Sequence, residues 1–313
     1  MGAIKLKGRS LLTWLDYSPE EIIFLLELSK KVKSEKHKKN QRFRGVSIAL
    51  LFEKRSTRTR CAFESAIGEE GGHPVFLSTA DIHLGTKEPI EDTARVLGRM
   101  FDAIQFRGFK QSTAETLVKY SGVPVYNGLT DLYHPTQALA DVLTIDEHFG
   151  TYKNKKLCFV GDGRNNVARS LMVISAKLGI HFSIVSPKSL HPDTDLVEKC
   201  KPLFEAANVS CLITDDLEAV CGADVIYTDV WVSMGDEAQK EERIRLLTPY
   251  QVNESLFEKT GNSNCLFLHC LPAVRGEEVS AGILDGPQSC VWDEAENRKH
   301  TIKAIMLATL DIV

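Results

Sequence analysis

The chain has 313 residues, of which 43% are hydrophobic and 26% charged, and its net charge is -4, values typical of a two-domain protein with sizeable cores. The one basic stretch, Lys30–Arg44, is interrupted by Ser34, Glu35 and Asn40, so nucleic acid and anionic membranes are not expected partners. With no apolar run near the ~20 residues of a membrane span and no targeting presequence, the chain is expected to be cytoplasmic.

Short apolar runs alternate with helical patterns along the whole chain. Most runs are continuously apolar, as in strands that are buried on both faces of a parallel sheet. This alternation predicts an α/β fold with two domains, each a mostly parallel sheet flanked by helices. The predicted strands are Val46–Phe52, Pro74–Leu77, Ala103–Arg107, Val123–Tyr126, Lys156–Val160, Phe182–Val185, Val209–Ile213, Asp224–Tyr227 and Cys265–His269.

Helices are predicted between these strands. One apolar stripe at helical spacing comprises Val96, Leu97, Met100, Phe101 and Ile104, and a second comprises Val167, Leu171, Val173, Ile174 and Leu178. A helix over Pro135–His148 and the loop after it mark a domain boundary, which gives domains at 1–148 and 149–296. The final helix, from about Asn297, is expected to pack back on the first domain, so that 297–313 belongs to it.

Polar or reactive residues follow six of the predicted strands, three in each domain. In open parallel sheets, ligands bind beyond the carboxyl ends of the strands, so these residues predict an active site in the interdomain cleft. The segments are Ser56–Arg60, Arg107-Gly108, His134–Gln137, Gly161–Asn166, Asp229–Gly235 and His269–Pro272.

The segment Ser56–Arg60, with sequence STRTR, indicates an anion site. A helix N-terminus offers unpaired N–H groups and a positive dipole end, and Arg58 adds a bidentate donor for phosphate. The simpler alternative is an ordinary capped helix, but arginines in a first turn oppose the helix dipole. Arg107 alone is compatible with a surface arginine. His134 alone is compatible with a helix cap, but with Gln137 on the same helical face it would direct donors to a carbonyl.

Two other classes of site are disfavoured in the second domain. Gly161-Asp-Gly163 lacks the third glycine and the later acidic residue of a dinucleotide site, so no nicotinamide cofactor is expected. His269 and Cys270 adjoin on a strand and should face opposite sides, which disfavours both a metal pair and a nucleophile pair. None of the eight cysteines forms a Cys-x-x-Cys pair, so no metal is expected, and Cys270 is left as a thiol that faces the cleft.

Together these motifs resemble those of the aspartate and ornithine carbamoyltransferases. STRTR at 56–60 with HPTQ at 134–137 resembles the carbamoyl phosphate signature of that family. DVWVSMG at 229–235 and HCLP at 269–272 resemble its ornithine-binding elements, and DEAENR at 293–298 resembles its C-terminal signature. The resemblance covers almost the whole chain and implies a cofactor-independent transferase of arginine metabolism and amino-acid biosynthesis.

The resemblance also implies roles for individual residues. Carbamoyl phosphate would be bound by Ser56, Thr57, Arg58, Thr59, His83, Arg107, His134, Gln137, Cys270, Leu271 and Arg298. L-Ornithine would be bound by Asn165, Asp229, Ser233 and Met234. The catalytic set would be Arg58, Thr59, Arg107, His134, Asp229 and Cys270. In the family, the loop that carries His83 reaches a neighbouring subunit's site, which implies a homotrimer.

Two alternatives stay open on the sequence. The acceptor amine could be another molecule, such as putrescine, although putrescine lacks the α-amino and α-carboxylate groups that Asp229, Ser233 and Met234 would bind. The chain could also be a binding protein that has lost activity, although every expected chemical position is filled. The proton acceptor for the amine could be Asp229, Cys270 or the departing phosphate.

Overall fold

The computed structural model describes residues 4–38, 40–79, 82, 88–232 and 239–312. It divides into two compact units, of which the first comprises residues 1–140 and 296–313 and the second residues 141–295. Two helices, α5 (Pro135–Phe149) and α11 (Val291–Thr309), contain residues of both units. Among the described helices, none is both long and apolar enough to cross a membrane.

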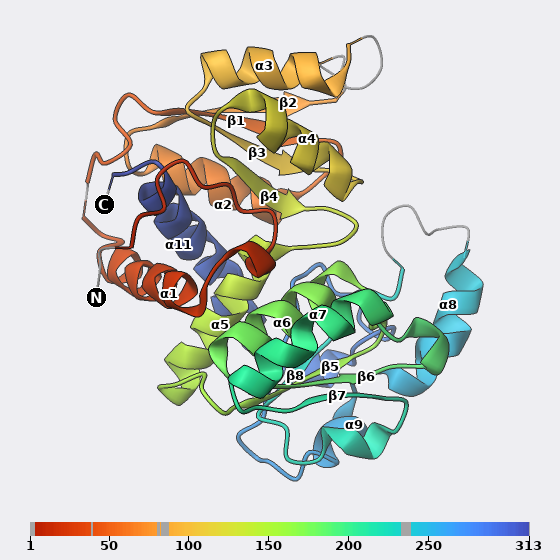
Figure 1. The fold of residues 1–313 in the computed structure, drawn as a ribbon. Coiled ribbons are helices and arrows are strands. Elements are labelled where there is room, and N and C mark those ends of the chain that lie inside the picture. Colours follow the sequence, from red (N-terminus) through yellow and green to blue (C-terminus); the bar gives the residue numbers. More distant parts are fainter. Residues whose placement is uncertain (1–3, 39, 80–81, 83–87, 233–238, 313) are drawn as a thin grey trace. The chain divides into compact units, whose positions relative to one another are not determined.

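The first unit contains a parallel four-stranded sheet in the order β2-β1-β3-β4 (Figure 1). Its strands are β1 (Ser47–Phe52), β2 (His73–Ser78), β3 (Ala103–Arg107) and β4 (Val125–Leu129), and its helices are α1 (Pro19–Ser34), α2 (Thr57–Gly68), α3 (Ile90–Met100) and α4 (Gln111–Ser121), after a short 3-10 helix at Trp14–Asp16. Strands β1, β3 and β4 bury side chains on both faces, as their apolar runs predict, whereas the edge strand β2 is only partly buried.

The two faces of this sheet contact different helices. Leu51 of β1 and Phe106 of β3 belong to a buried cluster with α3 and α4. On the opposite face, Tyr126 of β4 stacks on Phe63 of α2 at a ring distance of 6.2 Å, and its hydroxyl lies 2.7 Å from Thr309 Oγ1 in α11. Because side chains alternate along a strand, Arg107 lies on the face opposite Phe106. The strand thereby directs Arg107 to the α2 side.

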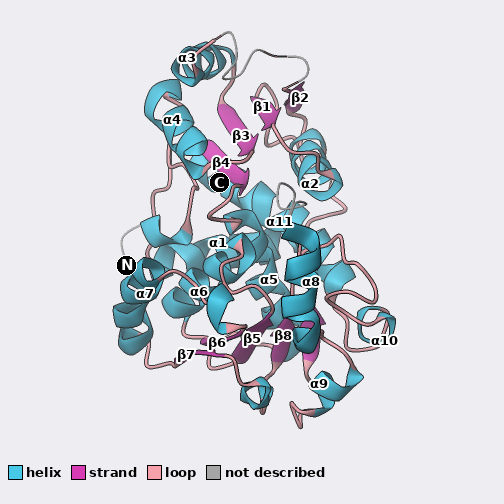
Figure 2. Cartoon of the chain, turned by 90° about the vertical axis from the view of Figure 1, so that its right-hand side faces the viewer, coloured by secondary structure: helices cyan, strands magenta, loops and turns pink. Residues whose placement is uncertain are grey.

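The second unit contains a parallel five-stranded sheet in the order β7-β6-β5-β8-β9 (Figures 1 and 2). Its strands are β5 (Lys156–Val160), β6 (His181–Val185), β7 (Cys211–Thr214), β8 (Val225–Tyr227) and β9 (Leu266–Leu268). Its helices are α6 (Asn166–Leu178), α7 (Thr194–Ala206), α8 (Lys240–Leu247), α9 (Glu254–Glu258) and α10 (Ala281–Leu284), with 3-10 turns at Lys188–Leu190, Leu217–Val220 and Thr248–Tyr250. The predicted fold class of parallel sheets flanked by helices is confirmed.

Both sheets reverse their strand order once. In the first sheet the chain passes from β1 to β2 on one side and then to β3 on the other. In the second it passes from β5 to β6 and later to β8 on the opposite side of β5. The crevice at such a reversal, beyond the carboxyl ends of the strands, is where open α/β sheets bind ligands. The residues that follow β1, β3, β5 and β8 therefore border these crevices.

Two details of the predicted helices are wrong. Val96 and Met100 are 46% and 68% exposed, Phe101 is the extended residue that ends α3, and Ile104 belongs to β3. The buried side of α3 is formed instead by the small residues Thr93 and Ala94 with Leu97. The last helix begins at Val291, six residues before the predicted start at Asn297. The five residues of the second stripe, from Val167 to Leu178, are all buried in α6, as predicted.

Candidate active site

The N-terminus of α2 is the centre of a polar group in the first unit. Ser56 is the N-cap, and its hydroxyl accepts a hydrogen bond from the backbone N–H of Thr59 over 3.2 Å. The remaining N–H groups of the first turn, together with the dipole of a twelve-residue helix, favour an anion here. The Thr59 side chain is buried beneath this turn.

Two buried guanidinium groups approach Thr59. Arg107, at the end of β3, donates from Nη1 to Thr59 Oγ1 over 3.2 Å and to the carbonyl of Gly128 over 3.5 Å. Arg298, in α11, donates from Nη2 to the same hydroxyl over 3.4 Å. These acceptors are neutral oxygens, so they orient the guanidinium groups without cancelling their charge. The structure thus brings Thr59, Arg107 and Arg298 together, although 239 residues separate the first from the last.

Helix α5 supplies the acceptors that hold Arg298. Arg298 Nη1 donates to Gln137 Oε1 over 2.6 Å, and Nη2 donates to Thr136 Oγ1 over 3.2 Å. Gln137 was predicted as a ligand-binding residue, and its carbonyl oxygen here orients a guanidinium. Thr136 was not singled out from the sequence, although it lies between two residues that were. The available signal in the sequence is its hydroxyl in the first turn of a predicted helix; the structure shows that this hydroxyl is also buried.

His134, directly before α5, is buried and held in the neutral form. Burial lowers the pKa of its imidazole well below the ordinary value, and the nearby charges of Arg298, Arg107 and Arg58 lower the pKa further. Its Nδ1 lies 3.5 Å from the hydroxyl of Thr136. A neutral imidazole keeps one N–H donor for a polarised oxygen, and it adds no fourth positive charge to the group.

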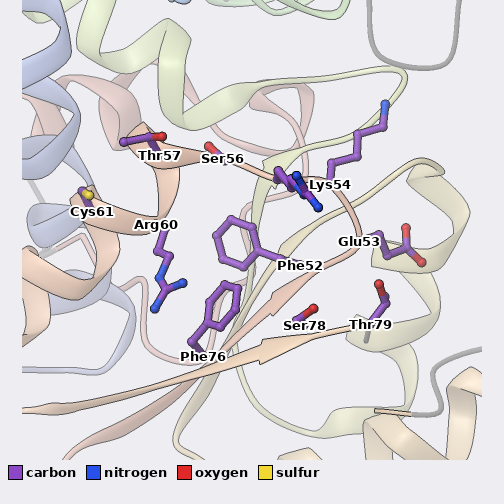
Figure 3. Close-up of a pocket in the computed structure, with 11 residues that line it drawn as sticks. Phe52, Glu53, Lys54, Ser56, Thr57, Arg60, Cys61, Phe76, Ser78 and Thr79 are labelled. Atoms are coloured by element: carbon purple, nitrogen blue, oxygen red, sulfur yellow. The ribbon is translucent and has the colours of Figure 1, made fainter. Parts of the chain in front are cut away.

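A cavity of about 560 Å³ adjoins the start of α2 (Figure 3). Ser56 and Thr57 line one part of it, and the guanidinium of Arg60 lies over the ring of Phe76, 3.7 Å from its centroid. Lys54 and Arg55, which follow β1, also line it. Thr59, Arg107, His134 and Arg298 are not among its lining residues. The N-terminal turn of α2 therefore offers Ser56 and Thr57 to the cavity, while the buried basic group lies behind this turn.

Asp229 is the centre of a second polar group, in the second unit. It follows β8, and its Oδ2 accepts from Asn165 Nδ2 over 2.9 Å while its Oδ1 accepts from the Cys270 thiol over 3.1 Å. Asn165 is also the N-cap of α6, since its Oδ1 accepts from the N–H of Val167 over 2.7 Å. Three predicted site residues, each beyond a different strand, thus form one hydrogen-bonded set.

Cys270 is held as a protonated thiol. Burial raises its pKa well above the ordinary value, and the charge of Asp229 and the hydrogen bond to it raise the pKa further, as do the charges of Glu294 and Asp141. A thiolate would be a nucleophile or a base, whereas a thiol at neutral pH is a donor. In this structure Cys270 orients the carboxylate of Asp229.

His269 and Cys270 lie beyond the end of β9, so the prediction that they face opposite sides of a strand is wrong. Together with Asp229 they place three possible metal-ligand atoms within 4.8 Å of one another. Both nitrogens of His269 are in use, however: Nδ1 accepts from the N–H of Leu271 over 2.8 Å, and Nε2 lies 3.2 Å from Glu278 Oε1. A metal at this position would have to displace one of these hydrogen bonds.

Leu271 and Glu278 complete this turn. Leu271 has a φ of +56°, which is uncommon for a residue with a side chain and is found preferentially at functional sites. Glu278 is fully buried, and its Oε1 also accepts from the N–H of Val274 over 2.6 Å. Sequence reasoning did not single out Glu278. The predicted site residues His83, Ser233 and Met234 lie outside the described residues.

Comparisons with known proteins agree across both units. Residues 9–147 match the family model of the aspartate/ornithine carbamoyltransferase carbamoyl-P binding domain, and residues 153–309 match that of the Asp/Orn binding domain. Relatives named ornithine carbamoyltransferase include one from Pseudothermotoga lettingae, 62% identical over 98% of this chain and 99% of its own, and one from Thermotoga maritima, 60% identical over the same shares. A solved ornithine carbamoyltransferase from Pyrococcus furiosus superposes with a TM-score of 0.95 at 44% identity, with 99% of each chain covered.

Proposed function

This chain belongs to the aspartate/ornithine carbamoyltransferase family, and from that premise we propose that it transfers the carbamoyl group of carbamoyl phosphate to the side-chain amine of L-ornithine. The products are L-citrulline and phosphate. The observation that carries the proposal is the convergence of Arg107 and Arg298 on Thr59, at the N-terminus of α2, with neutral His134 close to both guanidinium groups. Such a group suits a small molecule that carries both a phosphate and a carbonyl.

We assign the two substrates to the two parts of the chain. Carbamoyl phosphate binds to the part formed by 1–148 and 297–313, through the STRTR turn with Arg107, His134, Gln137 and Arg298. L-Ornithine binds to 149–296, through Asn165 and Asp229 with Ser233 and Met234. Cys270 and Leu271 contact the carbamoyl group. The carboxylate of Asp229, already oriented by Asn165, Cys270 and the N–H of Val230, supports this assignment because it can accept a hydrogen bond from an amine.

The proposed chemistry is acyl transfer without a cofactor. Donors from Thr59, Arg107 and His134 stabilise the oxyanion that forms at the carbonyl, each contributing roughly 3–4 kcal/mol where well placed. The amine must lose its proton first, because only a neutral amine can attack the carbonyl. An alkyl amine has a pKa of about 10.4, so neutralising it at pH 7 costs roughly 4–5 kcal/mol. The raised pKa of Cys270 makes a thiolate base unsuitable for this step. Asp229 or the departing phosphate therefore takes the proton.

The proposal extends to assembly and location. We propose a cytoplasmic homotrimer in which the loop around His83 reaches the carbamoyl phosphate site of a neighbouring copy. The cavity beside Ser56 and Thr57 supports this arrangement, because its lining by Lys54, Arg55 and Arg60 accommodates further polar groups at the phosphate end.

Citrulline formation from carbamoyl phosphate and an amine tests the function. Saturating rates are expected with L-ornithine, and rates at least tenfold lower with putrescine, because putrescine lacks the α-amino and α-carboxylate groups. Arg58→Ala should lower kcat/KM by about 100-fold or more, since it removes charge at the phosphate. Activity confined to putrescine would overturn the choice of amine. Absence of citrulline with every amine would overturn the proposed function.

A further inference from the structure

A pair of buried carboxyl groups lies in the second unit, outside the residues that the proposed mechanism uses. Glu294 is in the first turn of α11, and Asp141 is in α5; their side chains are 1% exposed or less and are hydrogen-bonded to each other. Burial raises the pKa of Glu294, and its hydrogen bond with Asp141 acts in the opposite direction.

The oxygens of Glu294 also bind the ends of two neighbouring strands. Oε1 accepts from the hydroxyl of Tyr227, the last residue of β8, over 3.0 Å. Oε2 accepts from the backbone N–H of His269, the first residue after β9, over 2.9 Å. One carboxyl group thus links β8 and β9, which are adjacent in the sheet, at the end where the candidate ornithine site begins.

The contact between Cys270 and Asp229 lies immediately beyond these two strand ends. Asp229 is two residues after Tyr227, and Cys270 is the residue after His269, so a shift of either strand end would change the 3.1 Å distance from the thiol to the carboxylate. We propose that Glu294, through its hydrogen bonds with the Tyr227 hydroxyl and the His269 N–H, is a positioning residue that sets the geometry of Asp229 and Cys270 toward ornithine. The proposal rests on the proposed function.

The burial of two acids supports a role beyond stability. Burying a carboxyl group is costly unless it is paired and hydrogen-bonded, and an apolar pair of similar volume would often stabilise a core as well. What apolar residues cannot provide is an acceptor for both the His269 N–H and the Tyr227 hydroxyl. The carboxyl group of Glu294 therefore fixes a particular register between two strand ends.

Steady-state kinetics of Glu294→Gln, Tyr227→Phe and the double variant test this inference. An amide has one acceptor oxygen, so Glu294→Gln cannot accept both hydrogen bonds. We expect Glu294→Gln to lower kcat/KM for ornithine about tenfold or more, with KM for carbamoyl phosphate within about twofold of the parent. Tyr227→Phe should cause a smaller loss. The double variant should be no worse than Glu294→Gln alone, because both changes remove the same contact.

Leu196→Ala provides a matched control in the same unit. Leu196 is buried in α7, so its truncation should lower the melting temperature of the enzyme without changing either KM. If Glu294→Gln fails to fold, Tyr227→Phe and Asp141→Asn carry the same comparison. The inference is overturned if these variants keep the parent's kcat/KM for ornithine, or if they raise the KM of both substrates equally. A parent enzyme that forms no citrulline overturns the proposed function itself.

Discussion

His134 lies close to Arg58, Arg107 and Arg298, and these charges together with burial decide its protonation state. The pKa of the folded His134 lies well below the ordinary value of about 6.5 that applies in the unfolded chain. Below pH 6.5 the unfolded chain therefore binds a proton that the folded chain does not. The stability that neutral His134 contributes is fully present above pH 6.5 and is lost as the pH falls.

The effect of pH on His134→Gln tests this charge state. The free energy of unfolding of the parent should fall by about 2 kcal/mol more than that of the variant between pH 6.5 and pH 5. Urea unfolding at several pH values measures both curves. The control His37→Gln, at an exposed position, should retain the pH dependence of the parent because His134 is still present. Parallel curves for the parent and His134→Gln would contradict the neutral assignment.

Single residues of the candidate site were predictable to different degrees. Arg107 and Asp229 follow strands that the apolar runs locate, so their place beyond a sheet could be inferred from the sequence. The contact between Arg298 and Thr59 could not, because no local pattern predicts which side chains meet across 239 positions. Gln105 is similar: it is fully buried in β3, and its amide atoms have no hydrogen-bond partner within the described part of the chain. A polar residue in a strand pattern does not reveal this.

Helices α1 and α2 both begin with a serine N-cap, but only that of α2 lies at the candidate site. Comparing variants of the two caps separates the stability that a cap contributes from a role in substrate binding. Ser56 caps α2, and Ser18 caps α1 through a capping box with Glu21. Ser56→Ala and Ser18→Ala should each lower the free energy of unfolding by about 1 kcal/mol. Only Ser56→Ala should also raise the KM for carbamoyl phosphate, because only α2 begins at the anion site. Urea unfolding and initial rates measure the two effects, and equal KM values in the two variants would remove Ser56 from the site.

The packing of α3 against α4 depends on a missing side chain. A Cβ at Gly98 would lie 1.8 Å from the carbonyl oxygen of Ser121, which is backbone and cannot rotate away. Gly98→Ala should therefore lower the free energy of unfolding by about 1–3 kcal/mol. Gly68→Ala, where a Cβ meets nothing within 4 Å, should leave it unchanged or raise it by up to about 1 kcal/mol. Equal urea midpoints for the two variants would contradict this account of the α3–α4 contact.

This close approach also explains why the predicted face of α3 was wrong. Periodicity indicates that Val96 and Met100 face a core, but a helix that packs through Gly98 and Ala94 buries its small residues instead. The strands were predicted better: all nine apolar runs overlap an observed strand, because most strands of a parallel sheet between helices are continuously apolar. The start of α11 was placed too late because its first turn, with Asp293 and Glu294, looks polar although Glu294 is buried.

At the scale of the molecule, the proposed trimer predicts that mixing two inactive variants restores part of the activity. Arg58→Ala disables a site from its own chain, and His83→Ala from a neighbouring chain. If the two variants are unfolded together and refolded as an equal mixture, about a quarter of the sites should combine a native Arg58 with a neighbour's native His83. Citrulline formation should then recover to about a quarter of the parent rate. If the co-refolded mixture is no faster than the two variants refolded separately and then combined, the sites are not shared between chains.

Each of the two family models covers one of the two sheets, and each sheet has one of the two polar groups beyond its strand ends. Each sheet reverses its order once, and the predicted residues gather beyond that reversal, around Thr59 in the first unit and around Asp229 in the second. The sequence indicated much of these two groups because both contain polar residues that come soon after apolar strand runs.

The route of the chain through the units has a consequence for its synthesis. The first unit ends at residue 140 and resumes at residue 296, so a ribosome makes the whole of residues 141–295 before it makes Arg298. The second unit emerges and folds after Thr59, Arg107 and Gln137 have been synthesised and before Arg298 has. A nascent chain halted before residue 296 should therefore present a finished second unit and a first unit that lacks the guanidinium group between Gln137 and Thr59. The basic group around Thr59 is therefore completed last.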